Sequence, residues 1–160
     1  MRALAALILI PVLVGIFFEG RKVIWDNRVR ELCEKEGGVW VYENAQLPQQ
    51  YFDRDGLVRI PSKSKNPDHP LAFEAKPSDP YYYEWIDEPV VEGYLAVGKH
   101  TLNVYRAIDN KVLGRMIVFS RSGGDIPTFA HPSSFSCPEP NNRPDLLRMI
   151  FSNDQNKRHL

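Results

Sequence analysis

The stretch TLNVYRAIDNKVLGRMIVFSR, residues 101–121, decides the fold of this chain. Over residues 101–108 the side chains alternate in character with a period of two, which is the period of a β-strand. A second β-branched run covers residues 112–121, and Asp109-Asn110 separates the two runs. Both of these residues tolerate the left-handed backbone that a two-residue hairpin turn requires. The stretch therefore predicts an antiparallel hairpin at the centre of a sheet.

Two shorter runs flank this hairpin in the sequence. Residues 39–42 and 81–86 are rich in β-branched and aromatic side chains, which is the composition of strands. Residues 47–80 between them carry six prolines, so this region is predicted to be a long loop with one short strand at 57–60. After Gly124 the chain is predicted to run as irregular coil through Cys137.

Helical patterns lie before the first and after the last of these predicted strands. Apolar residues recur at steps of three and four over 23–35, and Gly37-Gly38 follows as a helix C-cap would. A second short helix is predicted at 145–151, with Pro144 at its first position. The predicted fold is α+β, with an amphipathic helix packed on a small antiparallel β-sheet.

Length and composition limit the domain organisation. The 160 residues fit one ordinary domain, and 25 % charged and 43 % hydrophobic residues are globular values. The formal net charge is zero, so no charge excess indicates nucleic-acid binding. The predicted organisation is a signal-anchor at 1–22, an α+β domain at 23–140 and a partly helical C-terminal extension at 141–160.

Residues 3–18 form an apolar run behind Met1-Arg2. Sixteen residues fall just short of the roughly twenty that span a membrane as a helix and exceed an ordinary signal-peptide core. Bulky residues occupy the positions that a cleavage site needs, so an uncleaved signal-anchor is the favoured interpretation. A cleaved signal peptide and a periplasmic domain remain the alternative. Basic residues after the run favour a cytoplasmic domain, whereas the basic tip and apolar core have the layout of an export signal.

Cys33 and Cys137 are the two cysteines of the chain. In a cytosolic protein they would be expected as free buried thiols, but in an exported one they predict a single disulfide that closes a loop of about a hundred residues. No Cys-x-x-Cys or closely spaced histidine pair is present, so the sequence predicts no metal site and no cofactor.

Six segments carry a resemblance to known sequences. They are Trp25-Asp26-Asn27-Arg28, Glu31-Leu32-Cys33, Gly37-Gly38-Val39, Val41-Tyr42-Glu43, Ser120-Arg121-Ser122-Gly123-Gly124-Asp125 and His131-Pro132-Ser133-Ser134-Phe135-Ser136-Cys137-Pro138. Over residues 25–138 this pattern resembles an uncharacterised proteobacterial family of small exported, often lipoprotein-like proteins. The resemblance implies an envelope location and no known activity. The chain departs from the lipoprotein-like members because no cysteine directly follows its apolar run.

The region around His131 contains the residue types of a hydrolase, since Asp125 and several serines lie nearby. No Gly-x-Ser-x-Gly motif is present, and a polar loop accounts for these residues more simply. No catalytic residue is therefore assigned. Gly123-Gly124 beside Arg121 suggests a backbone anion site, although a turn that ends a strand explains the same glycines and Arg121 could instead pair with Asp125.

The aromatic run at the start of 81–86 provides the candidate contact surface. Tyr81, Tyr83 and Trp85 would share one face of a strand and Tyr82 the other. Together with Arg121, Gly123, Gly124 and His131 they form the predicted set of contact residues. The sequence thus favours a non-enzymatic, membrane-anchored envelope protein with a protein partner. A periplasmic small-ligand or anion-binding domain is the alternative, and a hydrolase centred on His131 is a third hypothesis.

Overall fold

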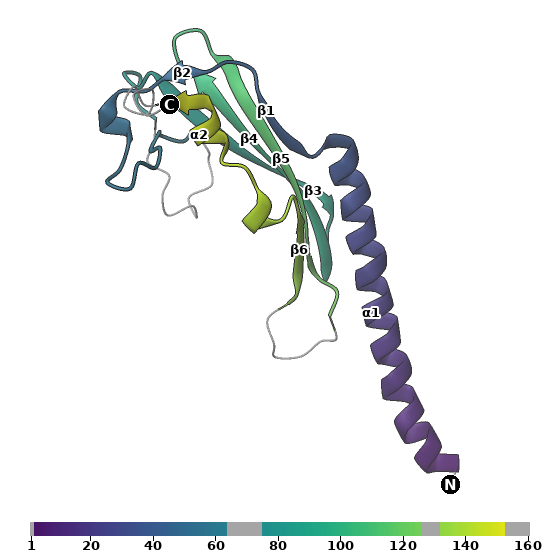
Figure 1. Cartoon of the computed structure of the whole chain (residues 1–160). Coiled ribbons are helices and arrows are strands. Elements are labelled where there is room, and N and C mark those ends of the chain that lie inside the picture. The colour runs from purple at the N-terminus through teal and green to yellow at the C-terminus, as the bar shows by residue number, and fades with distance from the viewer. Residues whose placement is uncertain (1, 64–74, 126–131, 153–160) are drawn as a thin grey trace. The chain divides into compact units, whose positions relative to one another are not determined.

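The computed structural model describes residues 2–63, 75–125 and 132–152 and has an α+β fold (Figure 1). The elements in chain order are helix α1 (Arg2–Glu36), strands β1 (Gly38–Val41) and β2 (Ala45–Gln46), the 3-10 turn η1 (Gln49–Tyr51), strands β3 (Tyr81–Val91), β4 (Leu95–Arg106), β5 (Lys111–Gly123) and β6 (Ser134–Cys137), the 3-10 turn η2 (Pro140–Asn142), helix α2 (Leu146–Ile150) and strand β7 (Phe151–Ser152). The N-terminal helix packs on an antiparallel sheet, as predicted.

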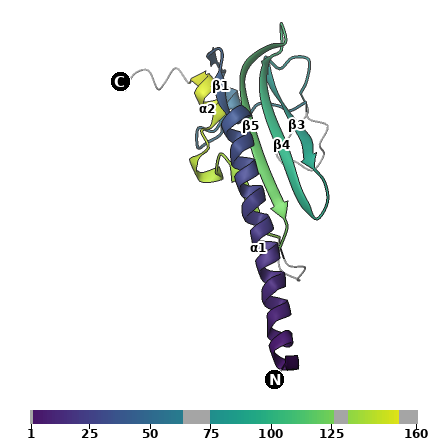
Figure 2. The ribbon, with the colours of Figure 1, turned by 90° about the vertical axis from the view of Figure 1, so that its right-hand side faces the viewer.

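The strand order of the main sheet is β1-β5-β4-β3, and β6 also pairs with β5. Figure 2 shows β5, β4 and β3 side by side. Trp40 of β1 lies opposite Arg115, and Cys137 of β6 lies opposite Phe119. Strands β2 and β7 form a separate parallel pair, which the sequence did not predict. The long strand β5 is therefore the one on which β1, β4 and β6 all pair.

The hairpin of β4 and β5 confirms the prediction from residues 101–121, with a correction at its turn. Residues 107–110 form the turn, so the reversal takes four residues and not the two of Asp109-Asn110. Asn110 does adopt the left-handed conformation, with φ of 52°. The Asp109 side chain accepts a hydrogen bond from the Lys111 amide at 3.2 Å, which secures the turn. Ile108 is not a strand residue; it lies at the tip and is 90 % exposed.

Helix α1 is continuous from Arg2 to Glu36. The sequence predicted an apolar segment followed by a separate amphipathic helix, whereas the structure has both in one helix. Between residues 19 and 25 no proline interrupts the backbone hydrogen bonds, and Gly20 has open space around it. The two helical patterns therefore join into one helix.

The prediction of a membrane-spanning segment is not supported. Among the described residues, no helix combines the length and the hydropathy that a membrane span requires. The apolar run of residues 3–18 is shorter than the roughly twenty residues of a typical span, and charged Glu19, Arg21 and Lys22 follow it.

The chain divides into two compact units. The helical unit comprises Met1–Gly37, Glu88–Lys99 and Val118–Pro140, and the sheet unit comprises Gly38–Asp87, His100–Ile117 and the residues from Asn141 onward. The core of the helical unit consists of Val29 and Cys33 from α1 with Leu95, Val97, Val118 and Phe119 from the strands. Each of these side chains is buried, so the inner face of α1 is held by apolar packing as well as by the contacts described below.

The core of the sheet unit lies between α2 and the strands. Leu146 and Ile150 of α2 are buried, as are Val104 and Met116. A β-carbon placed on Gly114 would lie 2.7 Å from Ile150 Cδ1 and 3.0 Å from Leu146 Cδ1. The glycine in the middle of β5 thus allows α2 to approach the sheet closely.

Three smaller predictions need correction. The expected strand at 57–60 is only an isolated bridge between Phe52 and Val58. The coil predicted before Cys137 is instead β6, because its backbone finds partners on β5. Helix α2 begins after Asp145, whose side chain caps the Leu147 and Arg148 amides, and not at Pro144.

Candidate functional site

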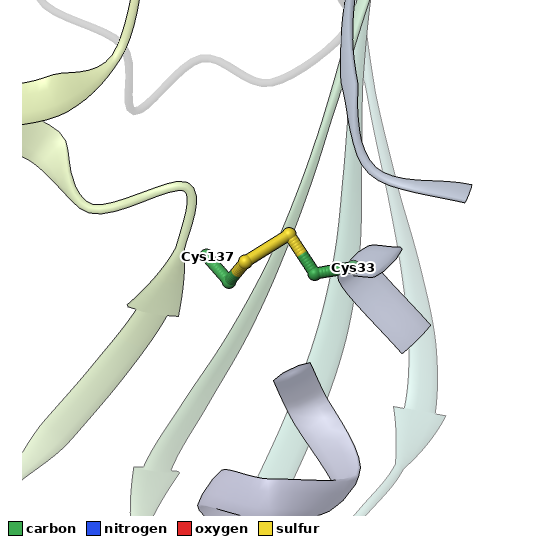
Figure 3. The surroundings of a disulfide bond; sticks show 2 residues. All are labelled: Cys33 and Cys137. Atoms are coloured by element: carbon green, nitrogen blue, oxygen red, sulfur yellow. A yellow bond between two sulfur atoms is a disulfide. The ribbon is translucent and has the colours of Figure 1, made fainter. Parts of the chain in front are cut away.

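The Cys33–Cys137 disulfide is formed, as the sequence predicted for an exported chain (Figure 3). It joins the last turn of α1 to the end of β6, with a Cα–Cα distance of 5.9 Å and a sequence separation of 104 residues. In the chain-entropy model a loop of this length contributes about 4.7 kcal/mol to the free energy of unfolding. The bond therefore fixes the last turn of α1 close to the end of β6.

The residue after α1 is adapted to this bond. The Gly37 amide donates to the Cys33 carbonyl at 2.7 Å, which closes the helix. A β-carbon on Gly37 would lie 2.7 Å from both the Cys33 carbonyl oxygen and the Cys33 Sγ. Position 37 therefore accepts only glycine without a shift of the backbone or the sulfur.

Four residues on one face of α1 contact the hairpin formed by β5 and β6. Lys22, Asp26, Arg30 and Cys33 are spaced by four, four and three positions, so they share a helix face. Their partners are, in the same order, Asp125 at 3.0 Å, Arg121 at 2.5 Å, the Phe135 ring centroid at 4.7 Å and Cys137 through the disulfide. We call these four pairs the helix clamp; they lie within the helical unit.

Arg121 is the most buried charged group of the helix clamp, with 3 % exposure. Its Nε donates to Asp26 Oδ1, and Nη1 donates to the Gly123 carbonyl and to Ser133 Oγ. The alternative pairing with Asp125 that the sequence allowed is wrong. A buried guanidinium without partners would cost several kcal/mol, so these contacts are needed to keep it inside the unit.

Asp125 pairs with Lys22 instead. The Ser133 amide donates to Asp125 Oδ2 at 2.6 Å and Lys22 Nζ to Oδ1 at 3.0 Å. These hydrogen bonds, first that from Ser133 and then that from Lys22, lower the pKa of Asp125 from 3.8 to about 2. The pKa of Lys22 is raised by its hydrogen bonds to Glu19 and Asp125. Both shifts favour the charged forms and hence the ion pair.

The two glycines after Arg121, one ending β5 and one following it, have left-handed backbone conformations. Gly123 and Gly124 have φ of 76° and 86°, and a β-carbon on Gly123 would lie 2.1 Å from the Tyr94 carbonyl oxygen. The Gly123 amide donates to the Ser133 carbonyl at 3.0 Å and is therefore committed within the chain, which removes one donor from the proposed anion site. His131 lies outside the described residues, so the hydrolase hypothesis rests on the sequence alone.

The aromatic run of β3 divides as strand alternation requires. Tyr81 packs edge-on against Phe151 at 4.9 Å, and Trp85 lies over His100 with a ring separation of 6.1 Å. Tyr82 stacks on Tyr105 at 5.0 Å. Tyr81, Tyr83 and Trp85 are half-buried, whereas Tyr82 is buried. Tyr81, Tyr83 and Trp85 belong to the sheet unit, whereas Arg121, Gly123 and Gly124 belong to the helical unit.

Trp85 lies beside two polar side chains, those of Asp87 and His100. Its Nε1 donates to Asp87 Oδ1 at 2.7 Å, and the same oxygen lies 2.5 Å from His100 Nδ1. Sequence reasoning missed this pairing because Asp87 and His100 lie on different strands. It also missed Lys22, Asp26 and Arg30 of the helix clamp. Their regular spacing with Cys33 was the available signal, because it places charged residues on the face that a disulfide would hold against the domain.

Comparisons with known proteins give no match, whether with family models, curated proteins or solved structures. The resemblance to an exported proteobacterial family therefore stays a prediction.

Proposed function

We propose that this chain is a non-enzymatic interaction module of an oxidising compartment of the cell envelope. The observation that carries this proposal is the bridge between Cys33 and Cys137. Disulfides persist in the periplasm and outside the cell and are rare in the reducing cytosol. The bridge also closes most of the soluble region into one loop, as is common in small exported domains.

The N-terminal segment supports the same compartment. Residues 3–18 follow a basic tip, which is the layout of an export signal. Leu9, Leu13, Ile16 and Phe17 have exposed apolar side chains, and apolar surface of this kind needs either a lipid environment or removal. In this proposal the segment directs export and is then retained in lipid as an anchor or cut off by a signal peptidase.

The proposed contact surface for a protein partner is the side of β3 that carries Tyr81, Tyr83 and Trp85. Trp85 is half-buried and has Asp87 and His100 beside it. Large aromatic side chains with polar neighbours dominate the binding energy of protein interfaces. Anion binding at Gly123-Gly124 has no such support, because the Gly123 amide already donates to Ser133.

Thiol labelling tests the compartment. Cells are lysed under alkylating conditions, and the denatured chain is labelled before and after reduction. We expect no free thiol before reduction and two afterwards, whereas two free thiols before reduction would refute the envelope location. The mass of the mature N-terminus and carbonate extraction of membranes then distinguish an anchored chain from a cleaved one.

Affinity purification under mild extraction tests the interaction. We expect a stoichiometric partner that is lost with Trp85→Ala, while Trp40→Ala, a partly exposed tryptophan on β1, keeps it. Equal retention by both variants, with unchanged melting temperatures, would exclude the β3 side as the contact surface.

A further inference from the structure

The two sulfurs of the disulfide have different surroundings. Cys33 is 8 % exposed and sits in the last turn of α1, under Gly37. Cys137 is half-buried and ends β6, a strand for which the structure describes pairing with β5 alone. An incoming reagent therefore has more direct access to Cys137 than to Cys33.

Charge reinforces this difference. The C-terminal end of a helix carries a partial negative charge, and Cys33 lies in that last turn of α1. Of the charged side chains in the turn, Glu36 pairs with Lys99 at 2.7 Å, and Glu34 and Lys35 are of opposite sign. A thiolate at Cys33 would face this negative end, and the thiolate is the form that attacks disulfides. Cys137, on a strand, has no helix end of its own. On the same strand, the Phe135 ring two residues before Cys137 lies against the Arg30 guanidinium at 4.7 Å.

The disulfide is not the only contact that holds α1 in position. Asp26 pairs with buried Arg121 and Lys22 pairs with Asp125. Val29, between Asp26 and Cys33 in the helix, is fully buried. These contacts remain available when the sulfurs are reduced. They keep the last turn of α1 against β6, so that Cys33 stays covered and close to Cys137 before the bond forms.

We propose that Cys137 reacts first with a disulfide donor and that Cys33, held in place by the ion pairs of the helix clamp, closes the bond. The Cys137 thiolate attacks one sulfur of the donor, forms a mixed disulfide and releases one donor thiolate. The Cys33 thiolate then attacks the Cys137 sulfur and releases the second. The two protein thiols lose two electrons and two protons, and the donor disulfide is reduced to two thiols. This inference builds on the proposed oxidising compartment, which supplies such a donor.

The test uses the full chain after reduction, under native conditions. A short pulse of N-ethylmaleimide is followed by peptide mass mapping of both cysteines, and each labelling rate is divided by its rate in concentrated urea. We expect Cys137 to react at least about fivefold faster than Cys33. With glutathione disulfide as the donor, Cys33→Ser should accumulate the mixed disulfide faster than Cys137→Ser.

Asp26→Asn tests the role of the clamp. It should raise the labelling rate of Cys33 and slow ring closure from the mixed disulfide. Glu31→Gln is the matched control, because Glu31 pairs with Arg28 on the exposed side of the same helix. Equal native rates for the two cysteines, or rates equal to those in urea, would overturn the inference. Such a result leaves the proposed function standing, which depends on whether the bond exists in cells.

Discussion

At the scale of single residues, the surroundings of the disulfide require particular side chains. Gly37 is the clearest case, because both the backbone carbonyl and the sulfur of Cys33 lie where a β-carbon would stand. The carbonyl belongs to the helix backbone and has little freedom to move. The requirement for glycine here is therefore one of space.

We expect Gly37→Ala to lower the free energy of unfolding by about 1–3 kcal/mol, the usual range for overpacking. Gly20→Ala in the same helix is the control, because nothing lies near its β-carbon and alanine favours helix by about 1 kcal/mol. Urea unfolding of both variants measures the difference. A Gly37→Ala variant as stable as the Gly20→Ala variant would contradict the close approach.

Asp125 should make the chain sensitive to acid. Its pKa is about 2 when folded, below its ordinary 3.8, so its contribution to stability is complete above about pH 3.8 and is lost as the pH falls towards 2. We expect Asp125→Asn to be less stable than the natural chain at neutral pH, with a smaller further loss on acidification. Melting temperatures across this pH range measure the effect, and parallel curves for the two proteins would argue against the Lys22 and Ser133 contacts.

At the scale of elements, the hairpin of β4 and β5 carries the sheet. Val104 lies in its centre and is fully buried, while Ile108 projects from its turn. Both are β-branched and lie on the same hairpin, so they form a matched pair of sites for the same substitution.

We expect Val104→Asp to abolish folding, because it places a carboxylate in the core of the sheet unit. Ile108→Asp should leave the melting temperature nearly unchanged. Asn110→Gly should still fold, because glycine adopts the positive φ of this position, with a loss of about 1 kcal/mol for the hydrogen bond that Asn110 Oδ1 accepts from Tyr82. Circular dichroism and size-exclusion chromatography provide the readout. A folded Val104→Asp chain would show that the strand does not face the core.

Element boundaries were predictable only where the signal is local. The alternation of residues 101–121 gave the hairpin, and the glycines after Glu36 gave the helix end. Strand β6 was missed because prolines surround it and its hydrogen-bond partners lie on β5, more than ten residues away. The continuity of α1 was not predicted, because the sequence changes from an apolar to an amphipathic pattern near residue 22 and such a change is typical of two separate segments.

At the scale of the whole molecule, one covalent bond links Cys33 and Cys137, which lie 104 residues apart in the sequence. Each single cysteine variant already removes this entire bond. We expect Cys33→Ser, Cys137→Ser and the double variant to lose nearly equal stability, about 2–5 kcal/mol. Urea unfolding of the oxidised natural chain and the three variants measures this. A double variant much less stable than either single one would mean that the remaining thiol has a second role.

The sequence by itself determined the α+β class and the hairpin, because strand alternation is local, and it limited the two cysteines to one possible internal bond, which the structure contains. Only the tertiary structure decided the partners of the charged residues. Arg121 could have paired with Asp125, a near neighbour in sequence, but the docking of α1 placed Asp26 beside its guanidinium and left Asp125 to Lys22. A sequence offers each charged side chain many possible partners of opposite sign. Which of them comes close enough to form an ion pair is decided only when the helix packs against the strands.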